Sequence, residues 1–334
     1  MNVQLHLGSY TEEGFGRGPG VLSTALDPEV PEMRATAVSR GVRNPSFLCR
    51  GPGGRLFAVE ELDHGQVVEL HPESLEVLAR SSSGGSFPCH LSVLDGGLLL
   101  VANYGSGTVS ALPLDGPWDE VPLWTVGGEG SGPVADRQEG PHAHSTLPLP
   151  DGRFLLADLG RDRVDEYRSG TDGAELVGGL DLPPGTGPRH LLLRGEELWI
   201  VGELDAALHR ATRRGDGWEL DGDAVPLAPG HEVAYPSELA LAPGGEALVV
   251  GVRGSDTVAV VDLAVRPARL GAELACGAWP RHLAWSEAES GESLLCVAAE
   301  RGHEISLYRW GRGDGLRPAG SVEAFSPTFV LPVG

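Results

Sequence analysis

The sequence predicts an all-β protein, a seven-bladed β-propeller built from four-stranded antiparallel blades. Three observations support this fold class. A short proline motif recurs seven times at the spacing of a propeller blade, each copy is followed by short apolar strands, and 49 Gly and 26 Pro residues punctuate a chain of 334 residues. A helical repeat would need a 3.6-residue periodicity, which the sequence does not show.

The motif consists of a small or aromatic residue, a proline, two variable residues and an apolar residue. Successive motif prolines lie 43 to 53 residues apart, with a mean of 47. The seven prolines are Pro45, Pro88, Pro141, Pro188, Pro236, Pro280 and Pro327. A four-stranded meander of about 45 residues is the size of a propeller blade, so we expect one blade for each motif.

The segment after each motif follows one pattern: an apolar strand, a Gly-containing turn, a second strand, a polar break and a third strand. The pattern is clearest in LLLVANYGSGTVSAL at 98–112, FLLADLGRDRVDEY at 154–167 and ALVVGVRGSDTVAVV at 247–261. Such apolar runs between turn residues are typical of strands in an all-β repeat.

The two chain ends are expected to complete the seventh blade together. The last motif leaves room for one strand before Gly334, whereas the first 43 residues hold three strands and no motif. We therefore expect the C-terminal strand to lie innermost, beside the N-terminal strands, which removes open sheet edges. Residues 1–334 are predicted to form a single propeller domain.

Charge and composition exclude several classes of function. The formal net charge of −22 would repel nucleic acid and anionic membranes. All 25 basic residues are arginines, which excludes Schiff-base chemistry by a lysine. No run of about 18 apolar residues predicts a membrane span, and residues 1–11 do not resemble a signal peptide, so we expect a cytoplasmic protein. The four cysteines form no CxxC pair and are interpreted as buried thiols rather than a zinc or redox site.

Polar residues at two repeated positions are the candidates for chemistry, because both positions are expected to face the central funnel. The positions after the motif proline hold His90, His142, His144, Arg189, His190, Glu238, Arg281 and His282. The turns after the second strand hold Glu60, Asn103, Asp158, Glu203, Arg253 and Glu300. Together they predict a charged, hydrated pocket suited to a small polyoxygenated anion.

Several of these residues have a structural interpretation beside the functional one. His90, His190 and His282 share one register, which indicates packing between blades. Asn103 and Asp158 precede turns, where such side chains often bond their own backbone. Arg189 and Arg281 both occupy the PRH position, and one of them could simply pair with a carboxylate of a neighbouring blade. Glu203 and Arg253 follow apolar runs and would be costly to bury unpaired.

His142 and His144 have the i, i+2 spacing that places two side chains on one strand face. That spacing could serve a metal, but no third ligand is evident, so we predict no metal and no cofactor. The longest interval between motifs, 53 residues, carries an extended connection before His142. Long connections are often functional, and a surface elaboration is the alternative.

The chain resembles the lactonase family of seven-bladed propellers, which includes bacterial cycloisomerase-type 6-phosphogluconolactonases and fungal carboxy-muconate lactonising enzymes. The most specific match is GSGPVADRQEGPHAHS at 130–145, supported by GPRH at 187–190 and PRHLA at 280–284. Two positions depart from the family: Val252 and Ala299 stand where an asparagine is usual. The resemblance implies four catalytic residues, His142, Arg189, Glu203 and Arg253.

The expected activity is hydrolysis of a sugar lactone, foremost 6-phosphogluconolactone to 6-phosphogluconate in the pentose phosphate pathway. Either His142 or Glu203 would be the general base, and the arginines would stabilise the oxyanion or bind the phosphate. The predicted substrate contacts are His144, Arg137, Asn103, Asp158, Glu238 and Arg281. The alternatives are an enzyme acting on a carboxylated lactone such as a muconolactone, and a non-catalytic binding module.

Overall fold

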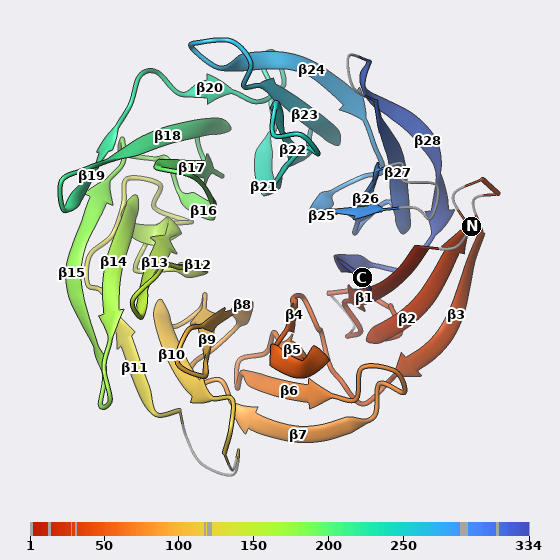
Figure 1. Ribbon diagram of the computed structural model, residues 1–334, viewed down its shortest axis with the longest axis horizontal. Coiled ribbons are helices and arrows are strands. Elements are labelled where there is room, and N and C mark those ends of the chain that lie inside the picture. Colours follow the sequence, from red (N-terminus) through yellow and green to blue (C-terminus); the bar gives the residue numbers. More distant parts are fainter. Residues whose placement is uncertain are drawn as a thin grey trace. The chain divides into compact units, whose positions relative to one another are not determined.

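The computed structural model describes residues 3–12, 15–27, 29–30, 32–116, 118, 122–287, 293–311 and 314–333. These residues form β-strands, turns and two short 3₁₀ helices, η1 (Pro52–Gly54) and η2 (Leu159–Arg161) (Figure 1). The all-β prediction is therefore confirmed. No helix within the described ranges has the length and apolar character that crossing a membrane requires.

The chain consists of two compact units, which are described separately. The first comprises Met1–Pro45, Glu73–Glu76 and Val225–Gly334, and the second comprises Ser46–Pro72 and Val77–Ala224. The single-domain organisation over 1–334 remains a prediction.

The first unit contains three four-stranded antiparallel sheets. One has the order β29 (Pro327–Pro332), β1 (Val3–Ser9), β2 (Val21–Asp27), β3 (Glu32–Ser39). The second contains β21 (Tyr235–Leu241), β22 (Ala247–Arg253), β23 (Thr257–Asp262) and β24 (Arg269–Ala275). The third contains β25 (Pro280–Glu287), β26 (Ser293–Ala299), β27 (Glu304–Gly311) and β28 (Gly315–Glu323). A two-residue strand, β20 (Val225–Pro226), precedes them in the chain.

The second unit contains the other four sheets, each a meander in which strands adjacent in sequence pair antiparallel. Figure 1 shows this order clearly for β12 to β15. The strands are β4 (Leu48–Arg50), β5 (Leu56–Glu60), β6 (Gln66–Leu70), β7 (Val77–Ser82); β8 (Pro88–Leu94), β9 (Leu98–Asn103), β10 (Thr108–Pro113), β11 (Trp124–Gly127); β12 (Ala143–Pro148), β13 (Arg153–Asp158), β14 (Arg163–Ser169), β15 (Ala174–Asp181); and β16 (Pro188–Arg194), β17 (Glu197–Gly202), β18 (Ala207–Arg214), β19 (Gly217–Leu220).

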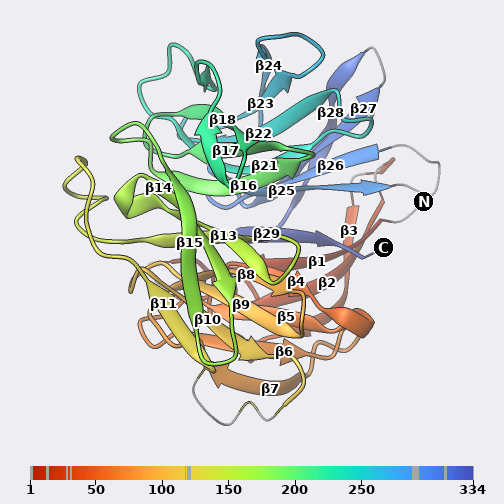
Figure 2. The same ribbon diagram turned by 60° about the vertical axis from the view of Figure 1, so that its left-hand side comes forward.

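The strand pairing confirms that the chain ends share one blade. β29 pairs antiparallel with β1, with Val330 opposite Leu7 and Leu331 opposite His6 (Figure 2). Phe329 and Val330 are buried, and the Thr328 hydroxyl donates a hydrogen bond of 2.9 Å to the Pro45 carbonyl. The count of seven four-stranded blades follows from this pairing.

Removing β29 is expected to destabilise the protein strongly. A variant truncated after Ser326 loses the β1 ladder and the burial of Phe329 and Val330, each worth about 1.5–3 kcal/mol. A thermal melt should show a transition far below that of the full chain. The control is a chain ending after Pro332, which keeps β29; equal melting temperatures for all three proteins would contradict the assigned pairing.

The proline motif builds the same local geometry in most blades. The residue before the motif proline adopts a positive φ at Asn44, Phe87, Gly187, Trp279 and Ser326. Pro88, Pro188, Pro280 and Pro327 are each the first residue of a strand, a position where a proline costs no ladder hydrogen bond. A register shift follows within four residues of the motif proline in β8, β12, β16, β21 and β25. Such bulges re-aim side chains, which explains why the residues after the proline are polar and not part of an alternating core pattern.

The hydrophobic core lies between neighbouring sheets of each unit. In the second unit, Leu100 and Ala102 of β9 pack with Phe154 and Leu156 of β13. In the first unit, Val249 of β22 packs with Leu295 and Val297 of β26 in the same way. Middle strands are buried on both faces, so they appear in the sequence as continuous apolar runs. This rigid packing fixes the strand ends from which the polar side chains project.

Candidate active site

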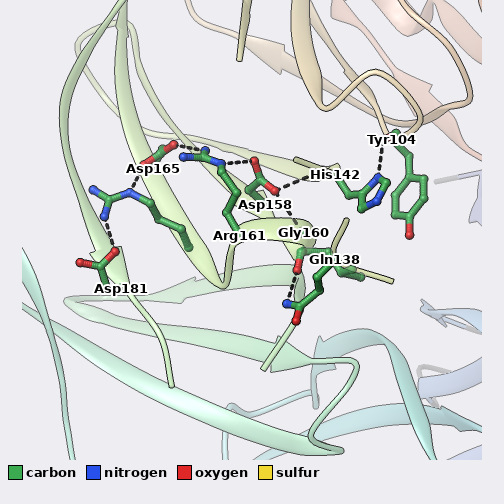
Figure 3. Close-up of polar contacts among 10 residues, drawn as sticks. Tyr104, Gln138, His142, Asp158, Gly160, Arg161, Asp165 and Asp181 are labelled. Carbon is green, nitrogen blue, oxygen red and sulfur yellow. Dashed lines mark hydrogen bonds and ion pairs between the residues drawn. The ribbon is translucent and has the colours of Figure 1, made fainter. Parts of the chain in front are cut away.

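His142 is held from three sides in the second unit. Its backbone N–H donates a hydrogen bond of 2.9 Å to Asp158 Oδ1, and its ring stacks on Tyr104 with centroids 4.4 Å apart (Figure 3). The Nδ1 atom lies 3.0 Å from the Tyr104 carbonyl oxygen, which can only accept a hydrogen bond. Nδ1 therefore carries a proton, and in the neutral ring Nε2 has the free lone pair.

Nε2 of His142 faces Glu139, whose Oε1 lies 3.2 Å away. Hydrogen bonds from the Glu139 backbone and from His142 lower the pKa of the Glu139 carboxyl. The carboxylate is exposed to solvent, whereas the His142 side chain is buried. A proton on Nε2 thus has an acceptor at the edge of the site, so His142 can both accept and donate a proton there.

Asp158 belongs to a chain of charged side chains that fixes the turn after β13. Its Oδ1 accepts hydrogen bonds from the backbone of His142 and Gly160, and its Oδ2 accepts from Arg161 Nε at 2.6 Å (Figure 3). Arg161 also pairs with Asp165, which in turn pairs with Arg163. The expected turn contact of Asp158 is present, and the same carboxylate positions the His142 backbone.

Gln138, which is fully buried, anchors the long connection. It accepts from the Val134 backbone at 3.1 Å and donates to the Leu159 carbonyl at 2.8 Å and to Asp162 Oδ1 at 2.6 Å. The connection is not loop throughout, because β11 forms the fourth strand of its blade; residues 117 and 119–121 lie outside the described part. Within the string RQEGPHAH, Gln138 therefore anchors the connection and positions its neighbours Arg137, Glu139 and His142.

Replacing Gln138 with leucine should loosen this connection. The variant keeps most of the side-chain volume but loses three hydrogen bonds, each worth about 0.5–1.5 kcal/mol net. We expect a lower urea midpoint and faster proteolytic cleavage within 128–141. Gln4→Leu, at an exposed position of β1, is the control; a Gln138 variant as stable and protease-resistant as that control would contradict the anchoring role.

Glu203 lies between two guanidinium groups. Its Oε1 accepts from Arg137 Nη2 at 2.5 Å, and its Oε2 lies 3.0 Å from Arg189 Nε. Glu203 and Arg189 are buried, while the Arg137 side chain is one-third exposed. Burial acts to lower the pKa of Arg137, but the charge of Glu203 and its hydrogen bond outweigh this and raise it. This cluster, called here the Arg137–Glu203–Arg189 cluster, carries a net positive charge.

The phenol ring of Tyr104 connects the cluster to the histidines. It stacks on His142 and meets His144 edge-on at 5.7 Å. Burial raises the pKa of its hydroxyl, and the nearby Arg137 opposes this shift. His142, His144 and Arg137 therefore gather around one aromatic ring, although they are not adjacent to it in sequence.

A second group of histidines packs beside this ring. His144 contacts His190 at 5.4 Å, His190 contacts His90 at 5.5 Å, and Phe47 covers His90 at 4.3 Å. His90 Nδ1 also accepts a hydrogen bond of 3.4 Å from the Thr146 backbone of the next sheet. In the first unit, His282 Nδ1 accepts from the Val330 backbone at 3.4 Å. This repeated contact supports the packing interpretation of His90 and His282.

The remaining predicted site residues fall into two groups. Asn103 is fully buried and donates to the Ser83 carbonyl at 3.1 Å and to the Ser110 hydroxyl at 3.2 Å, so its amide group holds the blade together. Arg253, Glu238 and Arg281 lie in the first unit. Arg253 donates to the Tyr235 carbonyl at 3.1 Å, Glu238 lies 3.4 Å from His282, and Arg281 lies 3.3 Å from Glu300. Arg189 and Arg281 thus each pair with the glutamate that follows the second strand of their own blade.

The cysteines and the acidic residues offer no metal or redox centre in the part of the chain that is described. All four cysteines are free, and burial raises the pKa of Cys49 and Cys296 to about 12. Thiols with raised pKa values are poor nucleophiles near neutral pH. Within the described ranges, no group of three or more His, Cys, Asp or Glu side chains is arranged to hold a metal ion.

Comparison with known proteins decides the family. The family model for the lactonase, 7-bladed beta-propeller, matches residues 4–332. This chain is a member of that family of lactonases. The lactonase is 27% identical to the 6-phosphogluconolactonase of Bacillus subtilis, with 93% of this chain and 92% of the relative covered. The propeller fold and the expected lactonase activity class are thereby confirmed.

Solved structures agree with the fold of this lactonase. The periplasmic gluconolactonase of Pseudomonas aeruginosa superposes with a TM-score of 0.86 at 24% identity, covering 100% of this chain and 99% of the other. A protein from Lactobacillus plantarum superposes with a TM-score of 0.88 at 23% identity, covering both chains completely.

Sequence reasoning missed Tyr104, Glu139 and Gln138 as site residues. Tyr104 lies in the turn NYGSG, and nothing in the neighbouring sequence indicates a functional role for a tyrosine there. Its contact with His142 joins two different blades. The only available signal for Glu139 and Gln138 was their place inside the specific string RQEGPHAH.

Proposed function

We propose that this lactonase hydrolyses a sugar lactone at the site around Tyr104, with 6-phosphogluconolactone as the main substrate. The observation that carries the proposal is the convergence of His142, which can move a proton, with the cationic Arg137–Glu203–Arg189 cluster on the ring of Tyr104. Lactone hydrolysis needs both functions, a proton acceptor for water and positive charge for an oxyanion.

His142 acts as general base and then as general acid in this proposal. Nε2 takes a proton from water as the water oxygen bonds to the lactone carbonyl carbon. The tetrahedral intermediate then collapses, the bond from that carbon to the ring oxygen breaks, and Nε2–H protonates the leaving oxygen. The Nδ1 contact with the Tyr104 carbonyl favours the tautomer that this step requires.

Glu203 acts through the arginines and not as the base. Its two carboxylate oxygens are both engaged by guanidinium groups, which stabilises the charged form and aims the donors. The guanidinium groups of Arg137 and Arg189 would bind the carbonyl oxygen as it becomes negative, or the phosphate of the substrate. The roles of Arg253, Glu238 and Arg281, which lie in the first unit, remain predictions from the sequence.

The relatives' names support the substrate class. The Bacillus subtilis relative is a 6-phosphogluconolactonase, and the Pseudomonas aeruginosa neighbour is a gluconolactonase. A small anionic sugar lactone is therefore the proposed partner, within the pentose phosphate pathway. We also propose that the protein is cytoplasmic. Detecting it with an antibody in separated cell fractions would test this location.

A substrate panel tests the proposal. Freshly prepared 6-phosphogluconolactone, gluconolactone and a muconolactone should be compared by kcat/KM, each corrected for spontaneous hydrolysis. We expect the phosphorylated lactone to be preferred by at least tenfold, since a phosphate engaging an arginine contributes about 1.5–3 kcal/mol. Preference for the muconolactone would overturn the substrate assignment, and no acceleration of any lactone would favour a binding module.

A further inference from the structure

The first unit contains a pocket of ≈ 600 Å³ that the proposed reaction does not use. Its walls come from the loop after β1, the turn between β26 and β27, and the residue before the last motif proline. The polar side chains that line it are Thr11, Arg17, Glu300, Arg301, His303 and Ser326. Two arginines in one pocket are notable in a chain with a net charge of −22.

The hydrogen bonds of His303 show that this pocket presents donors. The Ser326 backbone N–H donates to His303 Nδ1 at 3.1 Å, so Nδ1 must be the unprotonated nitrogen. In the neutral ring the proton is then on Nε2. Nε2 lies 3.3 Å from Arg17 Nη2, and a guanidinium nitrogen is always a donor. Two N–H groups therefore face each other, and no acceptor among the described residues bonds to both of them.

The other charged groups of the pocket add to this excess of donors and positive charge. Arg301 lies over the Trp279 ring, with its guanidinium carbon 3.5 Å from the centroid, and it has no ion-pair partner among the described residues. Glu300, the acidic member of the wall, lies 3.3 Å from Arg281 and is partly neutralised by it. Arg17 and Arg301 are both exposed to solvent, so an anion can reach them directly.

The backbone around the pocket holds Arg17 in place. A Cβ on Gly16 would lie 2.7 Å from the Cβ atoms of Ser326 and Tyr10, so the loop approaches this closely only with glycine. The Arg17 backbone N–H donates to the Ser326 hydroxyl at 3.3 Å. The guanidinium of Arg17 is thus attached to a loop that packs against the buried Ser326.

We propose that this pocket is a second anion site that binds a phosphate group through Arg17, Arg301 and His303. A phosphate oxygen placed between Arg17 Nη2 and His303 Nε2 would accept from both and remove the donor–donor contact. The planar donor edges of two arginines suit the several acceptor oxygens of phosphate. The pocket shares no residue with the Arg137–Glu203–Arg189 cluster, and the proposal does not rest on the proposed reaction.

Calorimetric titration with inorganic phosphate at constant ionic strength tests the site. Wild type, Arg17→Gln, Arg301→Gln and the control Arg34→Gln, an exposed arginine of β3, should be compared. We expect each pocket variant to weaken phosphate binding at least tenfold, with the control unchanged and chloride without effect. A parallel titration with glucose 6-phosphate shows whether the natural ligand is a phosphate ester or free phosphate. If glucose 6-phosphate binds and the pocket variants weaken its binding, the ligand is a phosphate ester. If only inorganic phosphate binds, the ligand is the free ion.

A spectroscopic readout tests the geometry itself. In ¹⁵N-labelled protein, the imidazole signals that disappear in His303→Phe belong to His303. They should show a protonated Nε2 and an unprotonated Nδ1, and phosphate should shift the Nε2 signal. The proposal is overturned if phosphate does not bind at millimolar concentration, if binding is equal in all four proteins, or if the His303 signals do not respond.

Discussion

Replacing His142 with glutamine is expected to lower kcat for lactone hydrolysis by about 10²–10⁴-fold, the usual contribution of one acid–base residue. Glutamine can still donate to the Tyr104 carbonyl, but it cannot accept a proton from water. The His142 backbone contact with Asp158 is independent of the side chain. The free energy of unfolding should therefore change by less than about 1 kcal/mol.

The His142 variant is best measured by single-turnover kinetics and a thermal melt on the same preparation. His64→Gln, at an exposed position, is the matched control and should retain full activity. If turnover of the His142 variant stays within threefold of wild type, another group is the base. If activity is lost only in proportion to folded protein, the role of His142 is structural.

Among the single substitutions, replacing Glu203 with alanine is expected to have the largest effect on stability. The substitution leaves Arg189, 4% exposed, without its carboxylate, and removing one partner of a buried pair costs about 3–5 kcal/mol. The substitution also removes the carboxylate that Arg137 contacts. The two guanidinium groups then repel each other and are no longer oriented by Glu203. Both the urea midpoint and kcat/KM should fall.

Glu300→Ala provides the matched control for Glu203→Ala. Glu300 occupies the equivalent turn of another blade and lies 3.3 Å from Arg281, but that pair is more exposed. Its loss should cost no more than about 1 kcal/mol, as for partly solvated pairs. Equal destabilisation by the two substitutions would refute a special energetic role for the Arg137–Glu203–Arg189 cluster.

The blade pattern could be predicted because each blade repeats the same local signals. The motif prolines mark the strand starts, and apolar runs such as LLLVAN mark middle strands that are buried on both faces. Even the shared blade of the chain ends followed from counting strands on either side of the motifs. These signals lie within short segments of the chain, so they can be recognised in a single sequence.

The site was only partly predictable, because its contacts join different blades. Glu203 was identified because an unpaired buried charge is costly, and Arg189 through the GPRH motif of the family; the structure pairs the two. The stacking of Tyr104 on His142 depends on how one sheet packs on the next, and that packing has no sequence signature. The donor–donor contact of Arg17 and His303 likewise required coordinates of segments 286 residues apart.

The most direct test of the account is a coupled assay of the purified protein on freshly generated 6-phosphogluconolactone, beside Arg189→Ala and a chelator-treated sample. We expect acceleration over spontaneous hydrolysis that survives chelation and falls by at least about 10²-fold in the Arg189 variant, as for loss of an oxyanion donor. Equal acceleration by wild type and Arg189→Ala would contradict the placement of the site, and loss of activity on chelation would contradict the metal-free mechanism.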